Sequence, residues 1–135
     1  MKPIRILLNS ALSNYRRFWA IPVIFSIFFF LRLYRLGYHD FWYDEIFTIW
    51  SAEKLKISWN APLYQIIMHF WVKIFEASEF SLRFPSLVFN YLAVITTYLL
   101  GRRLSGSRQA ALFAAIFMGL SPFHIWYSQE ARDYS

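Results

Sequence analysis

The stretch "FPSLVFNYLAVITTYLLG", residues 84–101, decides the fold, because it carries no charged side chain over 18 positions and is bounded by Arg83 and Arg102. A helix that crosses the hydrocarbon core of a bilayer needs about 20 mostly apolar residues. The composition agrees, since 58% of the residues are apolar and 16% are charged, against about 25% charged residues in a soluble domain. The sequence therefore predicts an all-α membrane protein.

Two further stretches predict spans on either side of this one. The downstream stretch "QAALFAAIFMGLSPFHIWYSQ" has 21 uncharged residues, and the upstream stretch "FWAIPVIFSIFFFL" has 14. The upstream span extends to Leu36 if Arg32 and Arg35, near its end, direct their long side chains to the interface. We thus expect about three transmembrane helices, over residues 18–36, 84–101 and 109–127.

The uncharged run "ISWNAPLYQIIMHFWV" has a different pattern, that of an amphipathic helix. Gln65, His69 and Lys73 share one face, and apolar side chains recur at helical spacing on the other. Such a helix suits the membrane interface, and we predict one over residues 62–75, with a fourth span as the alternative. Pro62 suits the first helical turn, and Asn60 is then placed as a cap.

The basic residues predict the orientation. They gather in the N-terminal tail and in the turn "RRLSGSR" at 102–108, and basic residues near span ends favour the cytoplasmic side. This indicates a multi-pass protein of the plasma (inner) membrane with a cytoplasmic N-terminus and one long extracytoplasmic loop, residues 37–82. All eight acids then lie outside. The basic residues form no continuous patch, so a nucleic-acid partner is not expected despite the net charge of +6.

The segment "HDFWYDEIF", residues 39–47, places three carboxylates among aromatic residues at the predicted outer boundary. Asp44 could N-cap a helix that runs from Glu45 towards Leu55. Alternatively, the pair could supply a general base, or hold a divalent metal, near a lipid-borne substrate. Both interpretations stay open, since cap and base can be different members of the pair.

The segment "SQEARDY", residues 128–134, carries the second group of charges. Glu130 and Arg132 are two positions apart, so they would not face each other on a helix. They could form a solvated helix end, or Arg132 could bind a lipid phosphate at the outer interface. His124 is expected to be packed or hydrogen-bonded, and the spacing of the histidines gives no convincing metal site.

In combination, these motifs resemble a known family. The sequences "RLYRLG" with "DE", "NAPLY", "SLRFPS" and "SPFHIWYSQEARDY" occur in order over residues 31–135. They resemble the N-terminal part of the membrane glycosyltransferases of the C-type superfold, in the protein O-mannosyltransferase and aminoarabinose-transferase-like group. Members of this group transfer a sugar from a polyprenyl-phosphate carrier to an acceptor on the outer side of the membrane.

The resemblance implies roles for particular residues. Asp44 falls at the position of the catalytic base, with Glu45 beside it in the catalytic site, and Glu130 and Arg132 fall near the donor-phosphate region. Asn60 stands at a donor-contact position where the family often has His or Lys, so a charged contact is not expected there. The polyprenyl-phosphate sugar would be the donor substrate, and a requirement for a divalent metal stays open.

The length of the chain leaves two functional interpretations. Members of the family run to several hundred residues, so these 135 residues correspond to the N-terminal portion of such an enzyme. We expect the isolated chain to be inactive. The alternative is a truncated, non-catalytic membrane protein that binds lipid or a partner.

Overall fold

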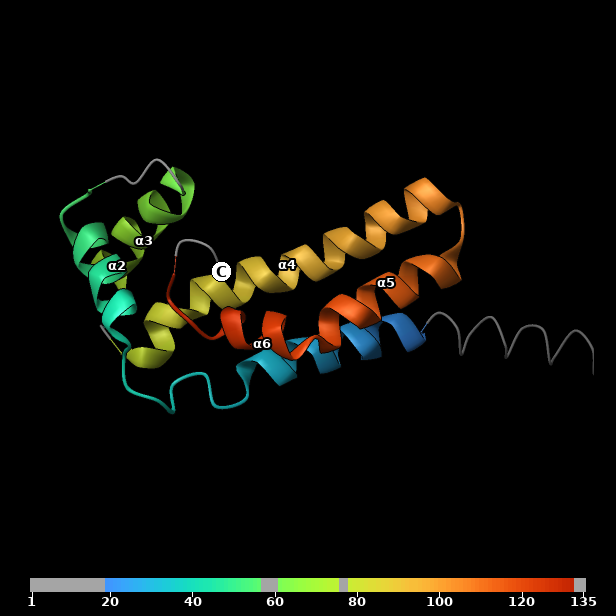
Figure 1. The fold of residues 1–135 in the computed structure, drawn as a ribbon, viewed down its shortest axis with the longest axis horizontal. Coiled ribbons are helices and arrows are strands. Elements are labelled where there is room, and N and C mark those ends of the chain that lie inside the picture. Colours follow the sequence, from blue (N-terminus) through green and yellow to red (C-terminus); the bar gives the residue numbers. More distant parts are fainter. Residues whose placement is uncertain (1–18, 57–60, 76–77, 133–135) are drawn as a thin grey trace, which may run out of the picture.

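The computed structural model describes residues 19–56, 61–75 and 78–132, and within these residues the chain is all-helical (Figure 1). A helix over Trp19–Leu33 is followed by five labelled helices: α2 (Tyr43–Glu53), α3 (Pro62–Ile74), α4 (Glu79–Ser105), α5 (Arg108–Leu120) and α6 (Pro122–Ser128). No strand occurs in the described ranges.

The Trp19–Leu33 helix, α4 and α5 pack side by side around an apolar core (Figure 1). The core residues are Phe25, Phe28, Val94, Tyr98, Ala111 and Ala115. A left-handed Gly106 (φ 64°) ends α4, and the side chain of Ser107 then accepts a hydrogen bond from Ala110 N–H to start α5. Close packing also needs Gly119, because a Cβ there would lie 2.8 Å from the ring of Phe28.

The described helices include one or two candidate membrane spans. Helix α4 is long and apolar enough to cross a bilayer, and it contains the predicted span 84–101. The Trp19–Leu33 helix is apolar but shorter than a span requires, so the span predicted over 18–36 stays a prediction.

The second candidate span is α5 and α6 taken together, and here the expectation of one continuous helix over 109–127 is wrong. The two helices are bent by 60° at their junction. Ser121 at the break has an extended backbone (φ −59°, ψ 119°), and Pro122 begins α6. Proline has no N–H to continue the helix of α5 and disfavours a helical conformation in the residue before it.

Helices α2 and α3 pack against the N-terminal end of α4 around a second cluster, Ala52, Tyr64, Met68 and Leu82. The predicted helix over 62–75 is confirmed as Pro62–Ile74, with Pro62 in the first turn. The residue that caps it is Ala61, not Asn60, and Asn60 itself lies outside the described residues.

Helix α3 buries a mixed face that includes two of its three polar residues, whereas Lys73 is exposed. Gln65 and His69 are buried, and the Nδ1 atom of His69 lies 2.7 Å from the carbonyl oxygen of Ala52. The apolar residues Leu63, Ile66, Phe70 and Ile74 are exposed. This arrangement suits an apolar environment around the helix, and a position in the membrane interface stays a prediction.

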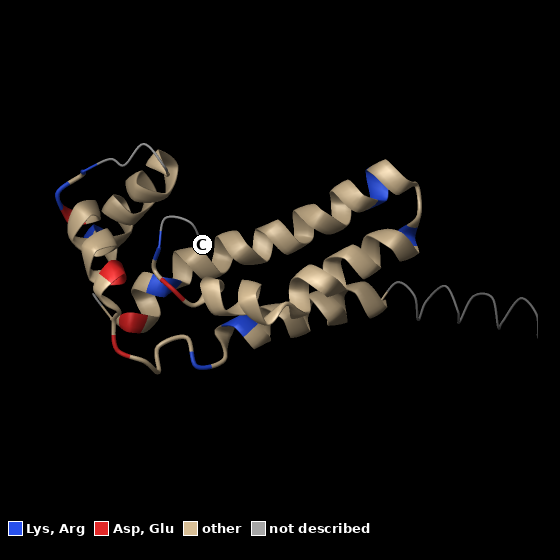
Figure 2. Ribbon diagram, viewed as in Figure 1, with Lys and Arg blue, Asp and Glu red and all other residues tan. Residues whose placement is uncertain are grey.

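Acidic residues are confined to one part of the molecule, where basic residues also occur (Figure 2). The acidic residues of the described segments gather at the end that carries α2, α3 and α6, and the opposite end, at the α4–α5 turn, shows only basic residues. The predicted orientation depends on this distribution, because it places the basic α4–α5 turn on the cytoplasmic side.

Candidate functional site

Helix α2 begins at Tyr43, two residues earlier than expected, and this changes which carboxylate binds its N-terminus. The N-cap residue is Trp42, and Asp44 lies inside the first turn. The expectation that Asp44 is the cap is therefore wrong. The Oε2 atom of Glu45 instead accepts a hydrogen bond from the backbone N–H of Trp42 at 3.0 Å. Asp44 is left with a side chain that is 62% exposed.

Glu45 lies at the centre of the charged cluster and is completely buried. Arg83 binds it in a bidentate manner, with Nε donating to Oε1 at 2.9 Å and Nη2 donating to Oε2 at 2.8 Å. The backbone N–H of Ala131 donates to Oε1 at 2.7 Å. With the bond from Trp42, each oxygen of Glu45 accepts two hydrogen bonds, which is the full capacity of a carboxylate.

Arg83 is satisfied as fully as its partner. Its Nη1 atom donates to the carbonyl oxygens of Leu36 (3.2 Å) and His39 (2.8 Å), and Nη2 also donates to that of Asp40 (3.1 Å). All five N–H donors of the guanidinium are therefore used. The Glu45–Arg83 pair joins α2, α4, the stretch that leads into α2 and the segment after α6.

These contacts also set the proton affinity of Glu45. Burial alone would raise the pKa of the carboxyl group, but the hydrogen bonds from Arg83, Ala131 and Trp42, with the charge of Arg83, hold the pKa below its ordinary value of 4.5. Glu45 is thus ionised at neutral pH, and its carboxylate holds Arg83 and the backbone at Ala131 in place.

The segment after α6 brings the second group of predicted residues to the first. Arg132 Nη2 lies 2.7 Å from Asp44 Oδ2, and Arg132 Nε lies 3.3 Å from Glu130 Oε2. Glu130 is buried, and its Oε1 atom accepts a hydrogen bond from the indole of Trp126 at 2.8 Å. Glu130 and Arg132 can contact each other because neither lies on a helix: α6 ends at Ser128.

A second buried arginine lies at the bend between α5 and α6. Arg32 is 0% exposed and donates from Nη1 to the carbonyl oxygens of Phe28 (3.0 Å) and Gly119 (3.1 Å). Its Nη2 atom lies 2.9 Å from His124 Nδ1. The expectation that Arg32 extends to the interface is wrong, because the end of α5 provides polar partners inside the bundle, whereas Arg35 is exposed. The prediction of a hydrogen-bonded His124 is confirmed.

Four of the five residues predicted for the site therefore come together: Asp44 and Glu45 from the start of α2, with Glu130 and Arg132 from after α6. The fifth, Asn60, is not among the described residues. Sequence reasoning missed the central position of Arg83. The available signal was an arginine directly before an apolar stretch, where burial demands a carboxylate partner. In the described part of the chain, no group of three or more His, Cys, Asp or Glu residues could hold a metal ion.

Fold and site thus define an all-α protein with candidate membrane spans and a charged cluster at one end. The sequence profile of the dolichyl-phosphate-mannose-protein mannosyltransferase family matches residues 60–133. The chain belongs to this family, which is membrane-bound. An uncharacterized protein of Aquifex aeolicus (strain VF5) is 32% identical over 116 residues, and the alignment covers 75% of this chain and 22% of that protein. The chain thus spans about a fifth of the length of that relative. No solved structure matches.

Proposed function

We propose that this chain is the N-terminal portion of a glycosyltransferase that moves a sugar from a polyprenyl-phosphate carrier to an acceptor on the extracytoplasmic side of the membrane. The observation that carries the proposal is the ion pair of 2.7 Å between Asp44 and Arg132. It joins the acid expected to act as the base and the cation expected to bind the donor phosphate, from segments 88 positions apart in the sequence.

The two members of the pair suit the two ends of the reaction. The acceptor oxygen attacks the anomeric carbon, and its proton passes to the carboxylate of Asp44. The bond between the anomeric carbon and the phosphate oxygen breaks, and the polyprenyl phosphate leaves with the bonding electrons. A guanidinium at Arg132 would stabilise the charge that develops on this leaving group.

Glu45 has a different part in this proposal. Its oxygens already accept four hydrogen bonds from Arg83, Trp42 and Ala131, so it has no free lone pair for a substrate proton. We assign it a positioning role, since its bond to Ala131 N–H fixes the chain next to Arg132. Asp44 has a side chain that is 62% exposed, so an acceptor hydroxyl group can reach it, which suits the role of base.

Transfer by the full-length polypeptide that carries these residues tests the proposal. Asp44→Asn should lower the turnover number by about 10²–10⁴-fold, the usual contribution of a positioned base. Arg132→Gln should mainly raise the apparent KM for the polyprenyl-phosphate sugar, so high donor concentration should restore part of the rate. Glu53→Gln, at the other end of α2, and Arg103→Gln, at the α4–α5 turn, are the matched controls. If Asp44→Asn keeps near wild-type turnover, the assignment of Asp44 as the base is wrong, whereas absence of transfer by the unmutated full-length polypeptide would favour the non-catalytic alternative.

A further inference from the structure

We propose that a cavity beside the charged cluster binds a sugar ring, an inference that rests on the proposed function and locates its substrate. The cavity has a volume of about 580 Å³, within the range of about 300–1,000 Å³ of small-molecule sites. It lies between the end of the Trp19–Leu33 helix, the stretch that leads into α2, and α6 with the residues that follow it.

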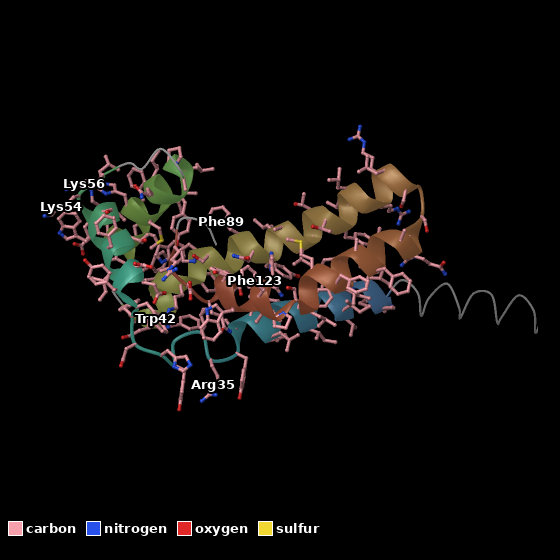
Figure 3. The ribbon with its side chains drawn as sticks, viewed as in Figure 1. Arg35, Trp42, Lys54, Lys56, Phe89 and Phe123 are labelled. Atoms are coloured by element: carbon pink, nitrogen blue, oxygen red, sulfur yellow. The ribbon has the colours of Figure 1, made fainter. Side chains whose placement is uncertain are left out.

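The walls of the cavity are aromatic and aliphatic. Tyr34, Trp42 and Trp126 contribute rings, and Leu31 and Ile125 contribute aliphatic surface. Trp42, labelled in Figure 3, is 58% exposed, and the indole of Trp126 is held in place by its hydrogen bond to a carboxylate. Aromatic rings of this kind provide flat apolar surface with a polar edge, and a pyranose has C–H faces that can pack on such a surface.

The polar groups of the cavity are mainly hydrogen-bond acceptors. Asp40 and Glu130 contribute carboxylates, and Gln129 contributes an amide whose Nε2 atom already donates to the carbonyl oxygens of Arg32 and Tyr34. The amide therefore offers its oxygen rather than its N–H groups. Carboxylate and amide oxygens accept hydrogen bonds from hydroxyl groups, which a sugar carries around its edge.

The buried cation of the cavity does not suit a phosphate. Arg83 lines the cavity, but all five of its N–H donors are used by Glu45 and three carbonyl oxygens. The guanidinium of Arg35 lies 3.8 Å above the ring of Tyr38, and Figure 3 shows Arg35 at the edge of the molecule. The chemistry of the lining thus favours a neutral polyhydroxyl group.

Glu130 connects the cavity to the proposed reacting pair. Its side chain lines the cavity and lies 3.3 Å from Arg132, which in turn contacts Asp44. A sugar in the cavity would therefore lie next to the residues assigned to the base and the leaving phosphate. The ring could belong to the lipid-linked donor or to a glycosylated acceptor, since both present the same chemistry.

Binding to the whole chain in lipid nanodiscs tests the inference. The probes are methyl α-D-mannopyranoside, citronellyl phosphate as a sugar-free isoprenyl phosphate, and citronellyl phosphomannose. The cavity variants are Asp40→Asn and Trp42→Ala, with Glu53→Gln and Trp50→Ala as matched controls on α2 outside the lining. A helical circular-dichroism spectrum equal to wild type shows that each variant is folded.

We expect saturable binding of the methyl mannoside, with a Kd raised about tenfold by Asp40→Asn and about two- to tenfold by Trp42→Ala. The controls should bind as wild type, and Asp40→Asn should leave the affinity for citronellyl phosphate unchanged. Competition between methyl mannoside and citronellyl phosphomannose would assign the cavity to the sugar of the donor, and simultaneous binding would assign it to the acceptor.

Two results would overturn the inference. The first is that the methyl mannoside shows no saturable binding. The second is that the cavity variants lose as much affinity for citronellyl phosphate as for the methyl mannoside, which would place the carrier lipid in the cavity. Failure of the proposed function is a separate outcome. If Arg132→Gln leaves citronellyl phosphate binding unchanged, the proposed phosphate contact is wrong, and the glycoside measurements still decide the cavity.

Discussion

Arg83 and Arg32 are both buried, at 3% and 0% exposure, yet they are stabilised in different ways. Arg83 has a bidentate carboxylate partner in Glu45 and three carbonyl oxygens. Arg32 has carbonyl oxygens and an imidazole, and among the described residues no carboxylate forms an ion pair with it.

The difference shows what each arginine holds in place. The ion pair of Arg83 joins four segments at the end of the bundle where the candidate site lies. Arg32 binds the carbonyl oxygen of Gly119, one of the groups that the end of α5 leaves without a helical partner. One arginine therefore assembles the site, and the other stabilises the break in the α5–α6 segment. Four predictions test this comparison, in order of decreasing effect on stability.

Arg83→Met should give the largest loss of stability. It leaves the carboxylate of Glu45 buried without a counter-charge, which typically costs about 3–5 kcal/mol, and it removes the donors of three carbonyl oxygens. Glu45→Gln should cost less, because the amide oxygen can still accept from one N–H of Arg83 and the carbonyl contacts of Arg83 remain, although the NH2 group then faces two donors. Unfolding in mixed micelles of dodecyl maltoside and increasing SDS measures both. Equal losses for the two variants would mean that the carbonyl contacts of Arg83 contribute nothing.

Arg32→Met should cost less than Arg83→Met, about 1–3 kcal/mol, because it removes a buried charge together with its hydrogen bonds and leaves no opposite charge behind. The same unfolding assay applies, with Arg35→Met as the exposed control. Hydrogen exchange at the amides of residues 119–121, 123 and 124 should rise in Arg32→Met and stay unchanged in Arg35→Met. A loss as large as that of Arg83→Met would show that the comparison is wrong.

The pH dependence should isolate the contribution of Glu45. Its pKa is lower in the folded chain than the ordinary value of 4.5, so the unfolded chain binds more protons in the interval between the two values. The contribution of Glu45 is therefore complete above about pH 4.5 and is lost as pH falls through the folded pKa. The difference in unfolding midpoint between wild type and Glu45→Gln should narrow as pH falls from 7 to 3. If the difference in unfolding midpoint between wild type and Glu45→Gln stays constant from pH 7 to 3, the stabilisation does not come from the ionised carboxylate of Glu45.

Particular residues show how far the sequence predicts this molecule. Helix α4 and the α3 helix were predictable, since uninterrupted apolar residues and an amphipathic stripe are local patterns. The break at Ser121 was signalled by Pro122, but its stabilisation by Arg32 depends on a residue 87 positions from Gly119. The meeting of Asp44 with Arg132 depends on where the chain turns after Ser128. No local pattern determines such contacts, because they are set by the packing of helices distant in sequence.

The smallest effect on stability should come from the pair that we assign to the reaction. Asp44 is 62% exposed and Arg132 16% exposed, and ion pairs with an exposed member typically contribute about 0–1 kcal/mol. Asp44 is also not the cap of α2, so Asp44→Asn removes no capping bond, and the loss in the SDS assay should stay below about 1 kcal/mol. Arg132→Gln should lose somewhat more, because Arg132 also contacts Glu130. A large loss of transfer in a variant that unfolds like wild type must come from the chemistry of the lost carboxylate. If Asp44→Asn is instead destabilised as much as Glu45→Gln, Asp44 belongs to the structural cluster, and its assignment as the base loses its support.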